Sequence, residues 1–581
     1  MKTYEVIVAG LGPTGLTLAH LLGRAGISVL VLEREPEFYG NARAVYTDDE
    51  ALRVLQTAGV ADALHADMNV DSTVQWISAK GRPLVQFRTL DRPQGWPVTN
   101  FLYQPYFEDR MAELLAAYPH VEVRRGREVT GFTQDASGVT VEHARATGSG
   151  YGRRENTVDE TTGETARGAF LVGADGGRSI VRMSLGIDMS GRSYPERWLV
   201  VDLASRSGAD AFRHLPYFDF ICDPVMPVVS CPQPGGHHRF EFALTDDDAT
   251  EDFEDDATVR ALIGRYVDPD RVEVKRHLVY TFNAVVADRW REGRILLAGD
   301  AAHMTPQFIG QGMNSGIRDA DNLAWKLHAI LRHGADLSVL DSYESERRTH
   351  AQAMIDLSVF NKSLVSLKNP AGAAARDAAL SAAMVVPGLR GWLRRAGMKP
   401  KPKLPRGRFL GLPRPLLRGI EGTLAPQPEV RHYDGRPARL DDALGAGWAV
   451  IGFEVDPREV LGARRADWDR VDARYAVLYR AGTRPQATAA DALRAADLVD
   501  VEDIHGLLTD RLRKAGHRPG TLLVLRPDRY VFGASPDPAA LTDALIDQLG
   551  LRAAGRAAAA VPAPVPAPTT VAAPATTAKE A

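Results

Sequence analysis

Residues 6–33 of this chain read VIVAGLGPTGLTLAHLLGRAGISVLVLE. Apolar runs rich in valine and leucine stand at both ends of the stretch, as in two buried parallel strands. Between them Leu16, Ala19 and Leu22 fall on one helical face, and Gly26 supplies a helix stop signal. The stretch therefore predicts a strand–helix–strand unit, the building block of a doubly wound α/β domain.

The turn after the first of these strands carries a G-x-G-x-x-G motif. Gly10 allows a tight turn, Gly12 lets a pyrophosphate approach the backbone, and Gly15 lets the helix pack on the strand. Glu33 ends the second strand, where a carboxylate can bind the ribose hydroxyl groups of an adenosine. The unit predicts dinucleotide binding, but the motif alone does not distinguish NAD from FAD.

A second glycine-rich stretch, residues 294–327, reads RILLAGDAAHMTPQFIGQGMNSGIRDADNLAWKL. A short apolar run is followed by a Pro/Gly-rich loop and then by a helical pattern that we expect to begin near Asn314. Asparagine favours the N-cap, and the glycines before it allow close approach of a ligand. Such a helix start offers N–H groups and the positive end of a dipole to an anion. An ordinary strand–loop–helix corner fits the same residues equally well.

The sequence of residues 294–327 resembles the Gly-Asp motif of the FAD-dependent aromatic hydroxylases, which are single-component flavoprotein monooxygenases. The resemblance implies that Asp300, after Gly299, holds the ribityl chain of FAD. It also implies that the loop shields the reaction from water and that the helix start faces the pyrimidine edge of the flavin. The helix-start residues are Gly312, Met313 and Asn314, and the candidate catalytic residues are Pro306, Gly310 and Gly312. A second motif of this kind favours FAD over NAD.

Residues 170–182, FLVGADGGRSIVR, resemble a further FAD-binding motif of the same family. The resemblance implies that Asp175 contributes to the FAD site, although G-A-D-G alone is also an ordinary β-turn. It further implies that Arg43, in the loop after the second strand, and Gln104, at a helix start, contact FAD. The alternative for Arg43 is a solvated loop arginine.

The expected fold class is α/β, with a Rossmann-like FAD-binding domain interleaved with an antiparallel-sheet substrate domain, and a C-terminal thioredoxin-like α/β domain. The hairpin at 74–87 and short alternating strands between 186 and 287 indicate the antiparallel sheet. We expect FAD-binding parts at 1–73, 104–185 and 288–398, substrate-domain parts at 74–103 and 186–287, a linker at 399–405, the thioredoxin-like domain without C-x-x-C at 406–552, and a disordered Ala/Pro tail at 553–581.

Four polar residues of the antiparallel region, His214, Tyr217, His238 and Arg239, are candidates for contact with a substrate phenol or carboxylate. Residues of these types in such positions are more often ordinary sheet or surface residues. The C-terminal domain cannot perform thiol–disulfide chemistry without C-x-x-C, so we expect it to serve packing or formation of a homodimer.

Composition excludes several classes of protein. The formal net charge of −4 over 581 residues gives no indication of nucleic-acid binding. Cys222 and Cys231 are the two cysteines, too few for a disulfide framework or a cysteine-based zinc site, and no metal is expected. No apolar run reaches membrane-spanning length, and the N-terminus runs directly into a strand without room for a signal peptide. We therefore expect a cytoplasmic protein without a membrane partner.

Several segments, among them 41–60, 300–327 and 342–358, look like the 3-(3-hydroxyphenyl)propionate/3-hydroxycinnamate hydroxylase branch of the family. That branch implies ortho-hydroxylation of a phenolic acid with NADH and dioxygen, with NADPH left open. Residues 304–308 differ from the sequence typical of that branch. The alternative substrate is therefore another phenol, such as a resorcinol-type or aromatic polyketide compound. A non-catalytic flavin-binding regulator is a second alternative, whereas the W-x-W-x-I-P signature of flavin halogenases is absent.

Overall fold

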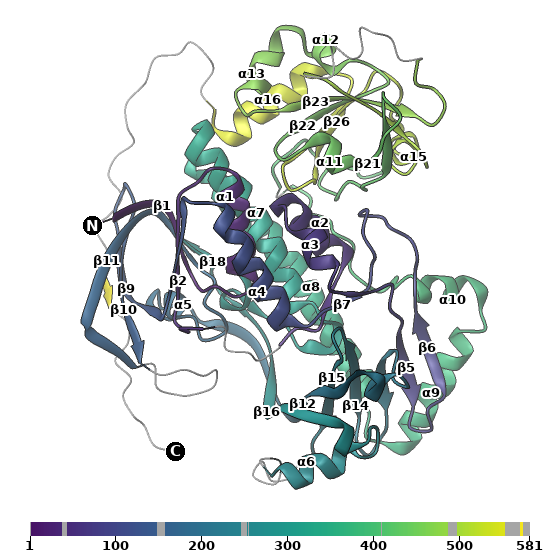
Figure 1. The fold of residues 1–581 in the computed structure, drawn as a ribbon. Helices are drawn as coiled ribbons and strands as arrows, with labels where there is room; N and C mark the ends of the chain where they lie inside the picture. Colours follow the sequence, from purple (N-terminus) through teal and green to yellow (C-terminus); the bar gives the residue numbers. More distant parts are fainter. Residues whose placement is uncertain are drawn as a thin grey trace.

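The computed structural model describes residues 2–37, 43–147, 157–245, 253, 255–407, 409–485, 497–551 and 570–572. Figure 1 shows a C-terminal sheet at the top, a parallel sheet with long helices in the middle, and an antiparallel sheet below. All three parts of the predicted fold class are present.

The parallel sheet contains the strand–helix–strand unit predicted from residues 6–33. Strand β1 (Lys2–Ala9) pairs in parallel with β2 (Val29–Glu33) on one side and with β11 (Thr157–Gly173) on the other. β18 (Ile295–Leu297) continues the sheet beyond β11, and β8 (Val121–Arg125) continues it beyond β2. The sheet is therefore completed by strands far apart in sequence. Each of the three glycine-containing motifs, at residues 10–15, 173–176 and 299–300, lies at the end of one of its strands.

Two helices pack together beside this sheet, α1 (Pro13–Arg24) and α7 (Gly312–His333). The second helix begins at Gly312, close to the predicted start near Asn314, but Asn314 is not its N-cap. Gln311 holds the N-cap position, directly after Gly310, which has a left-handed φ of 60°. The Asn314 side chain donates instead to the Gly310 carbonyl, 2.7 Å away, so it stabilises the turn that leads into the helix.

The antiparallel sheet lies apart from the parallel sheet and confirms the strand pattern expected for residues 186–287 and for the hairpin at 74–87. Its two longest strands pair with each other and reach back toward the parallel sheet. In sheet order the strands are β19 (His303–Met304), β16 (Val272–Ala287), β12 (Met189–Ala209), β15 (His237–Ala243), β14 (Val228–Gln233), β13 (Phe218–Cys222), β5 (Val74–Ser78) and β6 (Pro83–Phe87).

The C-terminal sheet has the thioredoxin-like order β23-β22-β25-β26 at one end. β22 (Ala449–Phe453) pairs in parallel with β23 (Arg474–Arg480) and antiparallel with β25 (Leu522–Leu525). β26 (Val531–Ser535) extends the antiparallel side. Both cysteines lie elsewhere, buried in the antiparallel sheet, so this domain carries no thiol.

Residues 399–405, predicted as a linker, begin with Lys399, whose ammonium group pairs with buried carboxylates. The Lys399 ammonium lies 2.9 Å from an Asp48 carboxylate oxygen and 2.7 Å from a Glu50 oxygen. The same Asp48 carboxylate also pairs with Arg318 of α7. The segment is therefore held against α2 (Asp49–Ala58) by a buried ionic cluster.

A second buried ionic cluster joins α8 (Asp341–Val365) to the C-terminal domain. Glu346 accepts from Arg526, and Lys326 of α7 lies 2.8 Å from the same carboxylate. Asp528 pairs with Arg526, and none of these four side chains is more than 1% exposed. Because each charge is neutralised by a buried partner, the C-terminal domain is fixed to the two long helices.

The predicted disordered tail lies outside the described residues except for Thr570–Ala572. Those three residues form β27, paired antiparallel with β9 (Arg127–Gln134). Disorder of the tail stays a prediction. No helix in the part of the chain that the structure describes is long and apolar enough to cross a membrane.

The remaining elements complete these layers. The helices are α3 (Ala61–His65), α4 (Gln104–Leu114), α5 (Ile180–Ser184), α6 (Asp256–Ile263), α9 (Pro370–Ala383), α10 (Pro387–Arg394), α11 (Leu440–Leu444), α12 (Pro457–Leu461), α13 (Arg465–Asp469), α15 (Thr509–Lys514) and α16 (Pro538–Leu549). The strands are β3 (Tyr46–Thr47), β4 (Asn69–Val70), β7 (Asn100–Phe101), β10 (Val139–Thr147), β17 (Arg291–Glu292), β20 (Glu429–His432), β21 (Pro437–Arg439) and β24 (Val499–Asp503).

Candidate active site

A cavity of about 1000 Å³ extends from the carboxyl ends of the parallel strands to one face of the antiparallel sheet. Of the predicted site residues, ten line it: Gly10, Gly12, Glu33, Arg43, Gln104, Asp175, Asp300, Gly310, Gly312 and Met313. Folding therefore brings into one cavity segments that are up to three hundred positions apart in the sequence.

Four predicted site residues do not line the cavity, and each has a structural reason. A Cβ atom on Gly15 would lie 2.1 Å from the Gly10 carbonyl oxygen, so Gly15 serves the close packing of helix and strand. Gly299 has a φ of 62°, and its Cβ would lie 2.6 Å from Thr14 Oγ1. The Pro306 carbonyl accepts a hydrogen bond from Ser358. With Asn314, these residues lie behind the cavity surface, and Gly15 packs against the strand as its position in the motif indicates. That Gly299, Pro306 and Asn314 contact a ligand stays a prediction.

The first glycine turn has the form that a pyrophosphate requires. A Cβ atom on Gly12 would meet nothing within 4 Å, so the backbone is open toward the cavity at the start of α1. That helix start has no side-chain cap and no acidic residue in its first turn. Its N–H groups and dipole are therefore oriented toward a negatively charged ligand.

The carboxylates of the motif residues Glu33 and Asp175, both on the cavity wall, accept hydrogen bonds from backbone N–H groups. Glu33 accepts from the amide of Leu11 at 2.8 Å and from the amide of Glu35 at 2.9 Å, and burial raises its pKa. Asp175 accepts from the Val181 amide at 3.2 Å, and burial raises its pKa as well. Its other oxygen, Oδ1, is buried without a hydrogen-bond partner among the described residues. Together with the open Gly12 turn, this unpaired acceptor fits a ligand rich in hydroxyl groups and phosphate, as FAD is.

Arg43 is held from three directions at the centre of the cavity. Its backbone amide donates to Gln104 Oε1 at 2.5 Å, and its guanidinium lies 3.2 Å from Asp300. Its carbonyl oxygen accepts from Arg239 of the antiparallel sheet at 2.8 Å. Gln104, predicted as a direct FAD contact, thus also fixes the loop that carries Arg43.

A buried charge supports the turn at Gly299 and Asp300 before α7, the Gly-Asp corner. Asp319 accepts from the Gly299 amide at 3.1 Å and lies 2.7 Å from His303 Nε2. Arg347 donates to the same carboxylate at 2.9 Å. Although burial opposes it, these partners hold the pKa of Asp319 below its usual value, so the corner rests on a fixed negative charge.

The far end of the cavity is apolar and aromatic. Phe101 and Phe218 stack with ring centres 5.3 Å apart, and Phe308 meets Phe282 edge-on at 5.1 Å. The wall continues over the sheet face with Trp76, Phe87, Phe220, Val200, Val229 and Leu278. A flat apolar ring is the ligand that such walls accommodate best.

A polar network that the sequence did not predict interrupts this aromatic face. Arg239, proposed only as one of four candidates, donates to Asp202 at 2.6 Å, and Arg276 lies 2.7 Å from the same carboxylate. Glu241 accepts a hydrogen bond from Gln307, and its Oε1 is 3.9 Å from Arg239. Of the other three candidates, His214, Tyr217 and His238, none lines the cavity. Alternation along residues 237–243 placed 239 and 241 on one face, and this was the available signal.

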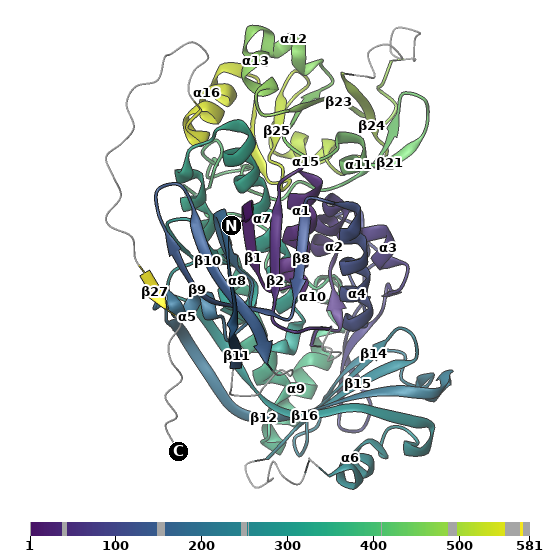
Figure 2. The same ribbon diagram turned by 60° about the vertical axis from the view of Figure 1, so that its left-hand side comes forward.

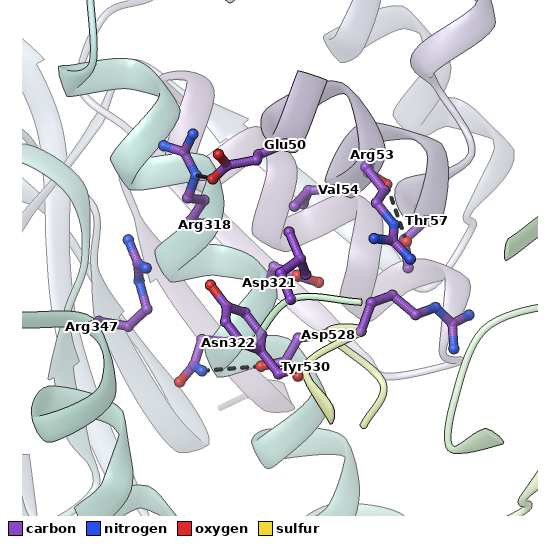
Figure 3. A pocket seen from close by; sticks show the side chains of 12 residues that line it. Glu50, Arg53, Val54, Thr57, Arg318, Asp321, Asn322, Arg347, Asp528 and Tyr530 are labelled. Carbon is purple, nitrogen blue, oxygen red and sulfur yellow. Dashed lines mark hydrogen bonds and ion pairs between the residues drawn. The ribbon is translucent and has the colours of Figure 1, made fainter. Parts of the chain in front are cut away.

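A second, much smaller cavity of about 30 Å³ lies between α2, α7 and the C-terminal domain. Figure 3 shows charged side chains converging on it, with Arg318 bonded to Glu50 and Asn322 bonded to Asp528. Asp321 has no hydrogen-bond or ion-pair partner among the described residues, and burial followed by the charge of Asp528 raises its pKa to about 8. The space holds about one water molecule, so this cavity is a feature of the domain junction.

Comparison with known proteins agrees with this geometry. Residues 3–358 match the family described as FAD binding domain, and residues 422–549 match the HcaD C-terminal domain. A 3-(3-hydroxy-phenyl)propionate/3-hydroxycinnamic acid hydroxylase 2 of Burkholderia vietnamiensis is 38% identical over 558 residues, which cover 95% of this chain and 96% of that protein. The chain belongs to the FAD-dependent aromatic hydroxylase family.

Other known proteins are similar along nearly the whole chain. A 3-(3-hydroxy-phenyl)propionate/3-hydroxycinnamic acid hydroxylase of Mycobacterium avium is 37% identical over 553 residues, 93% of this chain and 92% of that protein. The crystal structure of the anhydrotetracycline hydroxylase OxyS from Streptomyces rimosus has a TM-score of 0.69 and 26% identity, covering 94% and 98% of the two chains. The flavin-dependent monooxygenase PieE, at 21% identity and a TM-score of 0.73, shares the fold over 95% of this chain and 99% of its own.

Proposed function

We propose that this hydroxylase uses NADH and dioxygen to add one hydroxyl group ortho to the phenol of 3-(3-hydroxyphenyl)propionate and of 3-hydroxycinnamate. The observation that carries the proposal is the 37–38% identity, over more than 90% of the chain, to hydroxylases named for these two substrates. The aromatic end of the cavity supports it, because a single phenol ring suits the stacked phenylalanine walls.

In this proposal, different motif residues bind different parts of FAD. The Gly12 turn and the start of α1 bind the pyrophosphate, and Glu33 binds the adenosine ribose. Asp300 binds the ribityl chain, with Arg43 and Asp175 close by, and the amides at Gly312 and Met313 face the flavin. When bound, FAD accepts a hydride from NADH and activates dioxygen, and the protein supplies position and exclusion of water.

The loop between β19 and α7 performs the exclusion of water. Phe308, 2% exposed, packs on Trp198 and Phe282 and closes the cavity toward the antiparallel sheet. Ser358 holds the Pro306 carbonyl and so fixes the start of this loop. A dry site keeps the activated oxygen for the ring, because access of water would release it as peroxide.

A larger phenol is the second candidate substrate. The 26% identity to an anhydrotetracycline hydroxylase over 94% of the chain favours it, together with the size of the cavity. The two candidates separate in one experiment: the purified protein is supplied with FAD and NADH and offered single-ring phenolic acids and polycyclic phenols, and products are identified by mass spectrometry. We expect catechol products from the phenolic acids. Hydroxylation confined to polycyclic phenols would favour the second candidate, and FAD binding without any product would indicate a regulator.

NADH as the reductant is part of the proposal and has its own test. Substrate-dependent oxidation of NADH and of NADPH is compared at equal concentrations by absorbance. We expect a higher kcat/KM for NADH. A higher value for NADPH would leave the reaction class intact and change only the reductant.

A further inference from the structure

We propose that Glu241 accepts the proton of the substrate's phenolic hydroxyl group and that Gln307 orients its carboxylate for this step. This rests on the proposed function, since it requires a phenol in the cavity. The inference starts from the face of the antiparallel sheet that lines the cavity. In the part of the chain that the structure describes, Glu241 is the only acidic residue of that sheet on the cavity wall.

The Glu241 carboxylate has one occupied and one available oxygen. Oε2 accepts from the Gln307 side-chain amide, whereas Oε1 lies 3.9 Å from the nearest Arg239 nitrogen, beyond hydrogen-bonding distance. Arg239 is drawn away because Asp202 and the Arg43 carbonyl take its donors at 2.6 and 2.8 Å. Oε1 therefore keeps acceptor capacity for a hydroxyl group of a ligand in the cavity.

Gln307 places this carboxylate beside the part of the cavity where the ring must react. It begins the short helix η6 (Gln307–Ile309), one residue after Pro306, in the loop that leads into α7. The hydrogen bond from Gln307 thus connects the antiparallel sheet to the same loop that carries Gly310 and Gly312. A phenol held by Glu241 lies between the aromatic walls and this loop.

The step itself is a simple proton transfer. The phenolic O–H bond breaks, an O–H bond forms on the carboxylate, and the electron pair stays on the phenol oxygen, so nothing is oxidised or reduced. The electron-rich ring that results is a far better nucleophile toward an electrophilic oxygen than the neutral phenol. The proton returns to the hydroxylated product or passes to water.

The electrostatic surroundings of Glu241 suit a base that works near neutral pH. Burial raises its pKa to about 7, while the charge of Arg239 and the hydrogen bond from Gln307 act in the opposite direction. Tyr280 lies close enough that the Glu241 charge, after burial, raises the pKa of the phenol side chain. The titratable or charged groups packed around Glu241 are Arg239 on its own strand, Asp202 on β12, Arg276 and Tyr280 on β16, and Cys231 on β14.

The first test compares Glu241→Gln with Asp219→Asn in the FAD-loaded enzyme. Asp219 is a matched control because it is a buried carboxyl of the same sheet, bonded to Gln75, with a pKa raised by burial to about 6, and it does not line the cavity. We expect kcat in the parent and in Asp219→Asn to rise with pH through about 7. In Glu241→Gln the rise should vanish and kcat should fall about 100-fold. Both variants must retain the FAD content and melting temperature of the parent.

The second test measures binding without turnover, by flavin absorbance in the absence of oxygen and NADH. Affinity of the parent for 3-(3-hydroxyphenyl)propionate should increase with pH through about 7, because the ionised carboxylate accepts from the phenol. The methyl ether, 3-(3-methoxyphenyl)propionate, has no proton to donate and should show no such increase. Equal pH dependence for phenol and ether, or an unchanged pH profile in Glu241→Gln, would overturn the proposal.

Gln307→Ala provides a test that does not remove the carboxylate. Its hydrogen bond lowers the pKa of Glu241, so its loss should shift the rise in kcat to higher pH. An unshifted profile would show that Gln307 does not act through Glu241. A parent enzyme that hydroxylates no phenol would contradict the proposed function, whereas an active parent with an unaltered Glu241→Gln variant would contradict only this assignment.

Discussion

The guanidinium group of Arg43 forms an ion pair with the carboxylate of Asp300, with Nη2 and Oδ2 3.2 Å apart. The two residues are separated by more than 250 positions and belong to different motifs, yet both line the same cavity. The loop after the second parallel strand and the Gly-Asp corner are thereby held at a fixed separation. FAD binding should depend on both sides of this contact.

Asp300→Ala should lower FAD affinity by at least tenfold while the chain stays folded. A charged hydrogen bond to a ribityl hydroxyl group contributes roughly 1.5–3 kcal/mol, and about 1.4 kcal/mol corresponds to a factor of ten. The measurement is FAD titration followed by fluorescence quenching, with Asp543→Ala, a surface partner of Arg464, as control. Equal affinity in Asp300→Ala and the parent would show that Asp300 is only a turn residue.

Gly12→Ala should weaken FAD binding without changing the stability of the FAD-free protein. A Cβ atom there meets no protein atom within 4 Å, so the methyl group points into the space that the pyrophosphate needs. Gly388→Ala is the matched control, because its Cβ also meets nothing but lies in α10, away from the cavity. FAD titration and melting temperature of both apo variants give the answer. Normal FAD affinity in Gly12→Ala would place the pyrophosphate elsewhere.

Arg526→Ala should destabilise the protein by about 3–5 kcal/mol, because it leaves Glu346 and Asp528 buried without their common partner. Chemical denaturation followed by circular dichroism measures the loss. Arg464→Ala removes an exposed pair and should cost less than about 1 kcal/mol. Similar costs for the two variants would mean that the buried cluster does not hold the C-terminal domain.

Asp321→Asn should stabilise the protein increasingly as pH rises from about 5 to 8. Burial and Asp528 raise the pKa of Asp321 to about 8, so between the unfolded pKa of about 4 and this value the native state keeps a proton that the unfolded state has lost. The parent therefore loses stability across this window, and asparagine, which does not titrate, removes the loss.

Asp319→Asn, two positions earlier on α7, is the control of opposite sign. Its pKa is held low despite burial, so its contribution to stability is present above the unfolded pKa of about 4, and the variant should be less stable at neutral pH. Melting temperatures of both variants at pH 5 and pH 8 decide the matter. A pH-independent difference between Asp321→Asn and the parent would contradict the raised pKa.

The FAD-binding half of the molecule could be predicted because its signals are local. Gly10, Gly12 and Glu33 occupy fixed positions in one strand–helix–strand unit, and the Gly-Asp corner is contained within a single stretch of residues. The substrate end could not be predicted in the same way. Asp202 is the cross-strand neighbour of both Arg239 and Arg276, and this depends on the register of three strands.

Two further features of the structure could not be predicted from the local sequence. Asp48 caps α2 as its sequence position indicates, but its pairing with Arg318 and Lys399 depends on segments from distant parts of the chain. Asn314 has the composition of an N-cap, but the left-handed turn at Gly310 lets the helix begin earlier. Tertiary contacts decided the first case and the backbone turn decided the second, and propensity alone describes only the local preference.

The most direct test of the account is the source of the oxygen atom in the product. The purified protein is incubated with FAD, NADH and 3-(3-hydroxyphenyl)propionate under ¹⁸O₂, and the product is analysed by mass spectrometry. We predict a catechol that carries one ¹⁸O atom, formed with consumption of one NADH. A product without ¹⁸O, or oxidation of NADH with no hydroxylated product from any phenol offered, would contradict the assignment of a phenol-hydroxylating monooxygenase.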